Sequence, residues 1–240
     1  LGVFILFGGS FFLPQYLQLV LGFSPLEAAT WSLPWALAAI VGSIATPRLI
    51  GRVQRAHLMA GGLALASIGF ALLTRLDASV GLALLVPASV AFSLGVAPLF
   101  TLTNELVIGS VPPERAGAAS GVSETCAELG AALGIAVFGS VGVAVYRSAM
   151  ADAMPSVPAE AIEGARETLG AAVAIAAQIP DQIGAPLLQT ARRAFVQGLQ
   201  VSAAISAVGS LGLAIFTMRA LRGARPASEA EALSVDPPQA

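Results

Sequence analysis

Residues 120–146, SGVSETCAELGAALGIAVFGSVGVAVY, show which kind of fold this sequence specifies. Apart from Glu124 and Glu128, the stretch contains only apolar, aromatic and small polar residues. A helix needs about 20 apolar residues to cross the roughly 30 Å hydrocarbon core of a bilayer, and this stretch exceeds that length. It therefore predicts a membrane-spanning helix, and it raises the question of why that helix carries two carboxylates one turn apart.

The composition of the whole chain also indicates a membrane protein. Of the 240 residues, 56% are hydrophobic and only 11% are charged, whereas a typical soluble domain has about 25% charged residues. Too little polar surface would remain to face water. The 12 basic residues are all arginine, and they form no basic patch, which argues against nucleic acid as a partner.

Catalytic, metal and disulfide chemistry is not expected. The single cysteine, Cys126, cannot form an intramolecular disulfide. The single histidine, His57, has no His or Cys partner at ligand spacing. The motifs HExxH, GxSxG, Walker A and CxxCH are absent from the sequence. We therefore expect no enzyme, no cofactor and no metal site.

Six stretches are long and apolar enough to cross a bilayer as helices. They cover approximately residues 1–21, 25–47, 56–73, 80–108, 114–146 and 193–218. The sequence thus predicts an all-α membrane protein, a six-helix transmembrane bundle over residues 1–223, whose first helix is cut into at residue 1. Four prolines inside these spans are expected to form kinks, because neighbouring membrane helices satisfy the freed carbonyls: Pro14, Pro34, Pro87 and Pro98.

Arginines in the short connections set the expected orientation. One side carries Arg48, Arg52 and Arg55 after the second span, a single arginine before the fifth, and further arginines after the sixth. The positive-inside rule places this side and the C-terminus in the cytoplasm. On the opposite side we expect a long loop at about 147–191, containing a partly amphipathic helix that lies at the membrane surface. We expect residues 224–240 to form a disordered tail.

Glycines and acids share one stripe of the fifth span. At about 100° per residue, a single helical face collects Gly117, Gly121, Glu124, Glu128, Gly139 and Gly142. The four glycines allow another helix backbone to come close. We therefore expect both acids to face the inside of the bundle rather than lipid. Gly130 and Gly134 form a second pair of small residues on a different face.

Two carboxylates at membrane depth favour proton or cation coupling. A charged side chain there costs about 2.5–3.5 kcal/mol on insertion scales, so it persists only when paired, protonated or facing a wet cavity. Beyond Arg115 at its start, the span contains no arginine to pair with Glu124 or Glu128, and one acid of so close a pair is expected to hold a proton. The alternative is that Glu124 is shallow and merely solvated, whereas Glu128 lies deeper. Glu105, near the end of the fourth span, is either a shallow solvated acid or a relay group.

Other polar and aromatic residues are candidates for lining a cavity. Gln15 and Gln18 share a face of the first span, with Tyr16 beside them, and they either line a cavity or hydrogen-bond a neighbouring helix. Trp35 either stacks on a cation or fills space. Asn104 lies near the cytoplasmic end of the fourth span.

Four stretches together carry a resemblance to a known family. They are FFLPQYLQLVLGFSPLEAA (11–29), LPWALAAIVGSIATPRLIGRV (33–53), VPPERAGAASGVSETCAELGAALGIAVFGSV (111–141) and RRAFVQGLQVSAAISAV (192–208). With them the chain resembles the multidrug exporters of the major facilitator superfamily, in the fourteen-helix drug:proton antiporter branch that includes quaternary ammonium exporters. The resemblance implies that the chain is the C-terminal half of such a transporter.

The resemblance also implies a function, which is proton-coupled efflux of hydrophobic, often cationic, drugs or antibiotics across the bacterial inner membrane by alternating access. The partners would be the substrate, protons, the lipid bilayer and the N-terminal half of the same transporter. Glu124 and Glu128 match an acidic pattern in the corresponding helix of some quaternary ammonium exporters. Arg48, Arg52 and Arg55 match a degraded basic cytoplasmic loop and would be gating or orientation residues. Two alternatives stay open: a metabolite importer or uniporter of the same fold, and a non-transporting membrane scaffold.

Overall fold

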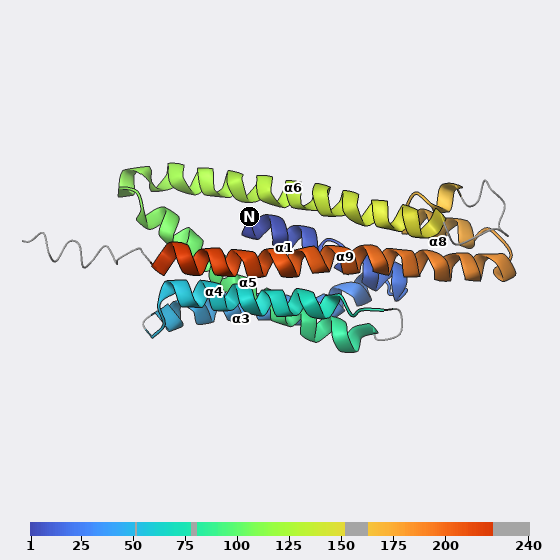
Figure 1. Cartoon of the computed structure of the whole chain (residues 1–240), viewed down its shortest axis with the longest axis horizontal. Coiled ribbons are helices and arrows are strands. Elements are labelled where there is room, and N and C mark those ends of the chain that lie inside the picture. Colours follow the sequence, from blue (N-terminus) through green and yellow to red (C-terminus); the bar gives the residue numbers. More distant parts are fainter. Residues whose placement is uncertain (51, 78–80, 152–162, 223–240) are drawn as a thin grey trace, which may run out of the picture.

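A computed structural model describes residues 1–50, 52–77, 81–151 and 163–222. Within these ranges the chain is a bundle of helices that run along a common direction (Figure 1), and the described residues include no strand. The elements are α1 (Gly2–Ser10), α2 (Leu13–Gln15), the π-helix η1 (Tyr16–Val20), α3 (Pro25–Ile50), α4 (Arg55–Leu73), α5 (Gly81–Gly109), the short 3-10 helix η2 (Pro113–Arg115), α6 (Ala116–Ala151), α8 (Leu169–Ala176) and α9 (Asp181–Arg222). Six stretches are long and apolar enough to cross a membrane, which confirms the predicted six-helix membrane bundle.

The first span is divided where the sequence places a proline. Pro14 lies in the three-residue helix α2, between α1 and the π-helix η1. Proline lacks the amide N–H that a continuous α-helix uses, and π-helical turns are frequent at functional sites. The other three prolines lie inside continuous helices, Pro34 in α3 and Pro87 and Pro98 in α5.

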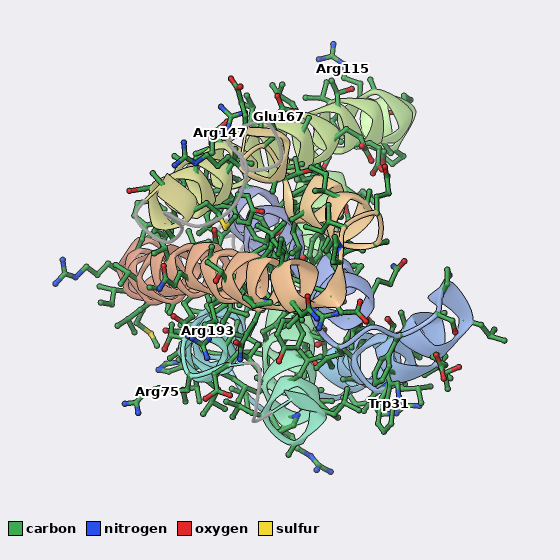
Figure 2. The ribbon with its side chains drawn as sticks, turned by 90° about the vertical axis from the view of Figure 1, so that its right-hand side faces the viewer. Trp31, Arg75, Arg115, Arg147, Glu167 and Arg193 are labelled. Atoms are coloured by element: carbon green, nitrogen blue, oxygen red, sulfur yellow. The ribbon has the colours of Figure 1, made fainter. Side chains whose placement is uncertain are left out.

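Helix α3 lies at the edge of the bundle. It packs mainly against α5, whereas α4 packs against both α5 and α9, and α6 packs against α1 and α9. Figure 2 shows Trp31 on the outer side of α3, pointing away from the other helices. The same helix carries a row of exposed apolar side chains, namely Leu33, Leu37, Ile40, Val41 and Ile44. An exposed apolar surface of this kind suits contact with acyl chains.

The last two long helices extend beyond the spans predicted from the sequence. α6 continues to Ala151 and α9 begins at Asp181, so the long loop expected at 147–191 contains the end of one helix and the first turns of the next. These helices have 36 and 42 residues. At 1.5 Å per residue they measure about 54 and 63 Å, more than a hydrocarbon core of roughly 30 Å. Both helices therefore project from the bilayer.

A short helix, α8, packs against the projecting part of α9. Its residues Leu169 and Ala172 are buried in the core of the bundle. The Tyr146 Oη atom donates a 2.6 Å hydrogen bond to the carbonyl of Ala165, just before α8. Where the sequence predicts an amphipathic helix within the long loop, the described residues thus contain a short helix that contacts α9. The tail expected at 224–240 lies outside the described residues.

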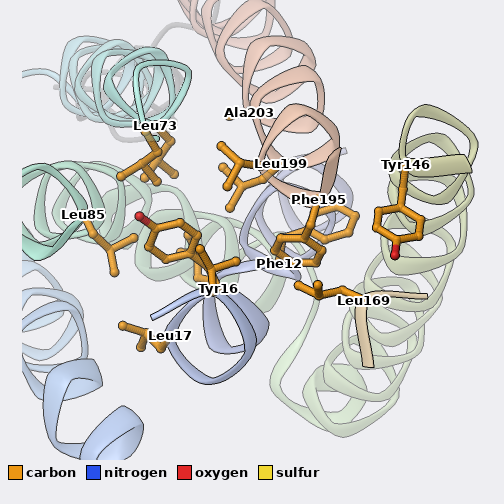
Figure 3. Close-up of a cluster of buried hydrophobic side chains, with 14 of the residues drawn as sticks. Phe12, Tyr16, Leu17, Leu73, Leu85, Tyr146, Leu169, Phe195, Leu199 and Ala203 are labelled. Atoms are coloured by element: carbon orange, nitrogen blue, oxygen red, sulfur yellow. The ribbon is translucent and has the colours of Figure 1, made fainter. Parts of the chain in front are cut away.

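An apolar core fills the end of the bundle that contains η1 (Figure 3). Tyr16 and Leu17 of η1 are fully buried there. Figure 3 shows the Tyr16 hydroxyl pointing away from η1 toward the side of α4 and α5. The large apolar side chains around it include Leu73, Leu85, Phe195 and Leu199.

Three side chains tie this end together by donating hydrogen bonds to backbone carbonyls of other elements. We call Tyr16, Arg192 and Gln200 the clasp. Their bonds are Tyr16 Oη to Asp77 at 2.8 Å, Gln200 Nε2 to Leu76 at 2.6 Å, and Arg192 Nε to Leu19 at 3.0 Å. The clasp therefore joins η1, α9 and the connection between α4 and α5.

Candidate functional site

A cavity of about 980 Å³ opens between α1, α5 and the first half of α6. We call it the main cavity. Its volume lies within the range of small-molecule sites, which are mostly apolar with a few polar groups. Its lining includes Val3 and Phe7 of α1, Leu99, Phe100, Thr103, Asn104 and Val107 of α5, Val122, Ser123, Glu124, Cys126, Ala127, Glu128 and Ala131 of α6, and Leu213 of α9.

Glu124 and Glu128 both line this cavity. Both side chains are exposed, and neither makes a hydrogen bond or ion pair with another described residue. Asn104 on α5 lines the same cavity and likewise has no hydrogen-bond partner among the described residues. Carboxylates and an amide without partners leave their full hydrogen-bonding capacity available to a ligand, a proton or water.

The position of the cavity follows from where α6 meets its neighbours. Gly134 lies so close to α1 that an added Cβ would overlap the Phe4 carbonyl. Further along, a Cβ on Gly142 would overlap the Phe12 ring, and a Cβ on Gly198 of α9 would lie 2.8 Å from the Gly142 carbonyl oxygen. Small residues thus allow tight packing over this part of α6.

The first turns of α6 make no such contacts with the described residues. A Cβ on Gly117 or Gly121 would meet no atom within 4 Å, so the described residues place no helix against these two glycines. Gly139 has only a loose neighbour, because a Cβ added there would lie 3.7 Å from a ring atom of Phe11. The close contact on this stripe is therefore made at Gly142. Toward Glu124 and Glu128, this face of α6 lies farther from the neighbouring helices. The main cavity lies in the space between them.

Glu105 does not line the main cavity, although it was a candidate for coupling. It forms an ion pair with Arg55, and the two side chains remain 43% and 48% exposed. Arg48, another residue of the predicted basic loop, donates a 2.8 Å bond from Nη1 to the Ile44 carbonyl of its own helix. Arg52 is exposed in the connection between α3 and α4. The pair between Arg55 and Glu105 thus joins the start of α4 to the end of α5.

Most other predicted cavity residues also lie outside the main cavity. Tyr16 is fully buried in the clasp. Gln15 donates a 3.3 Å bond to the Phe11 carbonyl of its own span, and Gln18 is exposed. Trp35 is half-buried and packs against the apolar core. Of this group, only Asn104 lines the cavity.

The rest of the α5 wall was not predicted from the sequence. Phe100, Thr103 and Val107 line the main cavity together with Asn104. These positions follow the i, i+3, i+4, i+7 spacing of one helical face. A polar and aromatic face on an otherwise apolar helix was the signal that would have identified them. No group of three or more metal-binding side chains occurs in the part of the chain that the structure describes.

The fold and the cavity together define a multi-pass membrane protein built like one half of a transporter. The comparison with protein families agrees with this class, because residues 1–135 match the model of the Major Facilitator Superfamily. The match covers more than half of the chain, and the chain belongs to this superfamily, which consists of transporters rather than enzymes.

Several relatives are named for drug efflux or drug resistance. The multidrug efflux pump LfrA of Mycolicibacterium smegmatis is 36% identical over 208 residues, which are 87% of this chain and 41% of that protein. The methyl viologen resistance protein SmvA of Salmonella typhimurium is 32% identical over 86% of this chain and 41% of its own length. The puromycin resistance protein pur8 of Streptomyces alboniger is 34% identical over 71% of this chain and 35% of its own length. The chain thus spans about two fifths of the length of such relatives, and they confirm the resemblance to drug exporters.

Proposed function

We propose that this chain is the C-terminal half of a proton-coupled exporter of hydrophobic, often cationic, compounds in the bacterial cytoplasmic membrane. The observation that carries the proposal is that Glu124 and Glu128, without partners among the described residues, share one cavity with the aromatic residues Phe7 and Phe100. The names of the relatives, which refer to multidrug efflux and to methyl viologen and puromycin resistance, support export rather than uptake.

The chemistry of the main cavity suits an exchange of a proton for a cation. A carboxylate attracts a cation more strongly where the surroundings exclude water, and the aromatic faces of Phe7 and Phe100 add attraction for a positively charged ligand. The same carboxylate oxygen binds a proton, so proton and substrate compete for Glu124 or Glu128. In alternating access, the site takes up a proton on the side where it releases the substrate. Asn104, on the opposite wall, supplies a donor and an acceptor that orient the ligand.

The N-terminal half of the same transporter is the partner that we propose for the first turns of α6. Gly117 and Gly121 face open space, and small residues at a membrane helix surface allow close helix packing. A helix of the other half would cover this surface and close the main cavity from a further side. We place the end of the bundle that carries Arg48, Arg52 and Arg115, together with the C-terminus, in the cytoplasm, because short cytoplasmic loops are enriched in arginine.

The test is proton-driven transport by the full-length protein in everted membrane vesicles. The probe is the lipophilic cation N-methyl-4-phenylpyridinium, and the variants are Glu128→Gln, Glu124→Gln and the double variant. Losing a charged hydrogen-bond partner costs about 1.5–3 kcal/mol, which corresponds to a fall of roughly 10- to 100-fold in kcat/KM. We expect this fall for at least one single variant and for the double variant.

The matched control is Glu114→Gln, because Glu114 is an exposed glutamate in η2 that does not line the main cavity. This variant should transport at the wild-type rate. Wild-type transport by the double variant would reject the coupling role of the pair. Transport that persists after a protonophore collapses the gradient would favour a uniporter, and proton-driven uptake into right-side-out vesicles would favour an importer.

A further inference from the structure

A second, smaller cavity of about 170 Å³ lies between α1, α3 and α5. Its lining includes Leu6 of α1, Ala39 and Ser43 of α3, and Ser93, Val96 and Phe100 of α5. Phe100 lines both this small cavity and the main cavity. One aromatic side chain therefore borders the two spaces.

The two serines of the small cavity differ from most hydroxyl residues of the same helices. Ser43 and Ser93 make no hydrogen bond with another described residue. In contrast, Thr46 of α3 donates to Gly42 at 2.7 Å, and Ser89 of α5 donates to Leu85 at 2.7 Å.

The difference matters because both helices are of membrane-spanning length. A hydroxyl that is removed from water without a hydrogen-bond partner is unfavourable. Ser93 is only 7% exposed, whereas Ser43 is exposed. Both hydroxyls line one cavity without a partner among the described residues, and both are available to a polar group that enters this cavity.

The size of the small cavity limits what enters. A cavity of about 150 Å³ with apolar walls is large enough to bind benzene, so this one accommodates about one aromatic ring. Apart from the two serines its lining is apolar or aromatic. The combination fits a single ring or short branch that carries a hydroxyl or carbonyl group.

We propose that the small cavity is a specificity subsite for the transported compound. It takes a ring bearing a hydroxyl or carbonyl group, while the cationic part of the same compound lies at Glu124 and Glu128 in the main cavity. Ser43 and Ser93 hydrogen-bond the polar group, and Phe100 packs between the two parts of the ligand. This inference rests on the proposed function of the main cavity.

The test uses two probes that differ by one hydroxyl group, N-methyl-4-phenylpyridinium and N-methyl-4-(4-hydroxyphenyl)pyridinium. For the full-length protein we measure the ratio of kcat/KM for the hydroxylated probe to that for the plain probe. The wild type should prefer the hydroxylated probe. The Ser43→Ala/Ser93→Ala variant should lower the ratio about 2- to 10-fold, which is the value of a neutral hydrogen bond.

A second variant and a control keep the result independent of folding. Ala39→Leu should also lower the ratio, because the added side chain fills the small cavity. The control is Ser89→Ala. The Ser89 hydroxyl also lies on α5, but it bonds within that helix, so the ratio of this variant should equal that of the wild type.

Two outcomes would overturn the subsite, and they are distinguishable. If the ratio is the same in the wild type, the double serine variant and Ala39→Leu, while the Glu124→Gln/Glu128→Gln variant still lowers kcat/KM of both probes by roughly 10-fold or more, the subsite is rejected and the proposed function stands. If the wild type transports neither probe, the proposed function fails and the subsite fails with it.

Discussion

The polar side chains discussed at the two ends of the bundle differ in their hydrogen-bond partners. At the clasped end, Tyr16, Arg192 and Gln200 each donate to a backbone carbonyl of another element. At the other end, Glu124 and Glu128 line the main cavity without a partner among the described residues. Both sets belong to helices of membrane-spanning length, where an unsatisfied polar group is costly.

The difference indicates which polar groups hold the fold and which serve a ligand. A donor that reaches a carbonyl freed by a π-helix or a connection satisfies both groups and fixes neighbouring elements. A carboxylate that faces an open cavity contributes no such contact. Substitution of the clasp residues should therefore change stability, whereas substitution of Glu124 or Glu128 should change transport.

The largest expected effect on stability is at the tightly packed part of α6. Gly142→Leu would force a side chain into the Phe12 ring, and we expect it to lower the free energy of unfolding by about 3 kcal/mol. The measurement is denaturant unfolding of the full-length protein in detergent. The control is Gly109→Leu at the cavity end, because a Cβ added at Gly109 would meet no atom within 4 Å. This variant should change the free energy of unfolding by less than about 0.5 kcal/mol. Equal effects of the two variants would contradict the difference between the ends.

The clasp should give the next largest effect. Gln200→Leu leaves the Leu76 carbonyl without its side-chain donor, and Leu76 is fully buried. We expect a loss of about 1–3 kcal/mol in the free energy of unfolding, because a buried acceptor is left unsatisfied. Gln18→Leu is the matched control, since Gln18 is an exposed glutamine of η1. If Gln200→Leu is as stable as this control, the clasp does not hold the end together.

The six spans could be predicted from the sequence because apolar length is a local property. The ends of the last two helices could not. Their outer turns project beyond the bilayer, where a helix no longer needs apolar residues, so hydropathy stops near Arg193 although α9 begins at Asp181. Helical periodicity placed Gly117 and Gly142 on one stripe of α6, but only the direction of α6 relative to its neighbours decides which glycine is packed.

The site was also predicted only in part, because the sequence shows residue types but not which distant residues meet. Carboxylates inside an apolar span are visible in the sequence, and Glu124 and Glu128 indeed line a cavity. The partner of Glu105 was not visible, because Arg55 lies 50 residues away on another helix. Tyr16 was similarly unpredictable, since its hydroxyl bonds to a carbonyl 61 residues along the chain.

The ion pair between Arg55 and Glu105 should have a smaller effect than the clasp. Both side chains are more than one third exposed, so solvent screens the pair and we expect it to contribute about 0.2–1 kcal/mol. Glu105→Gln should therefore keep proton-driven transport within about threefold of the wild type, a change of less than about 1 kcal/mol. The charge-reversed double variant Arg55→Glu/Glu105→Arg should restore any loss, and Arg48→Gln is a control without a partner on another helix. A loss of transport as large as that of Glu128→Gln would indicate that Glu105 takes part in proton or cation coupling.

The smallest expected effect concerns Cys126, which lies between the two acids, is exposed and lines the main cavity. A water-soluble maleimide should label it in the full-length protein when the main cavity is open to water. A bound lipophilic cation should slow labelling by the factor 1 + [L]/Kd, about twofold when its concentration equals Kd. The rate is measured by mass spectrometry of the full-length protein, with Cys126→Ser as the control for labelling elsewhere. Labelling that the cation does not slow would mean that the ligand binds away from this part of α6, and the cavity end would then lose the role that distinguishes it from the clasped end.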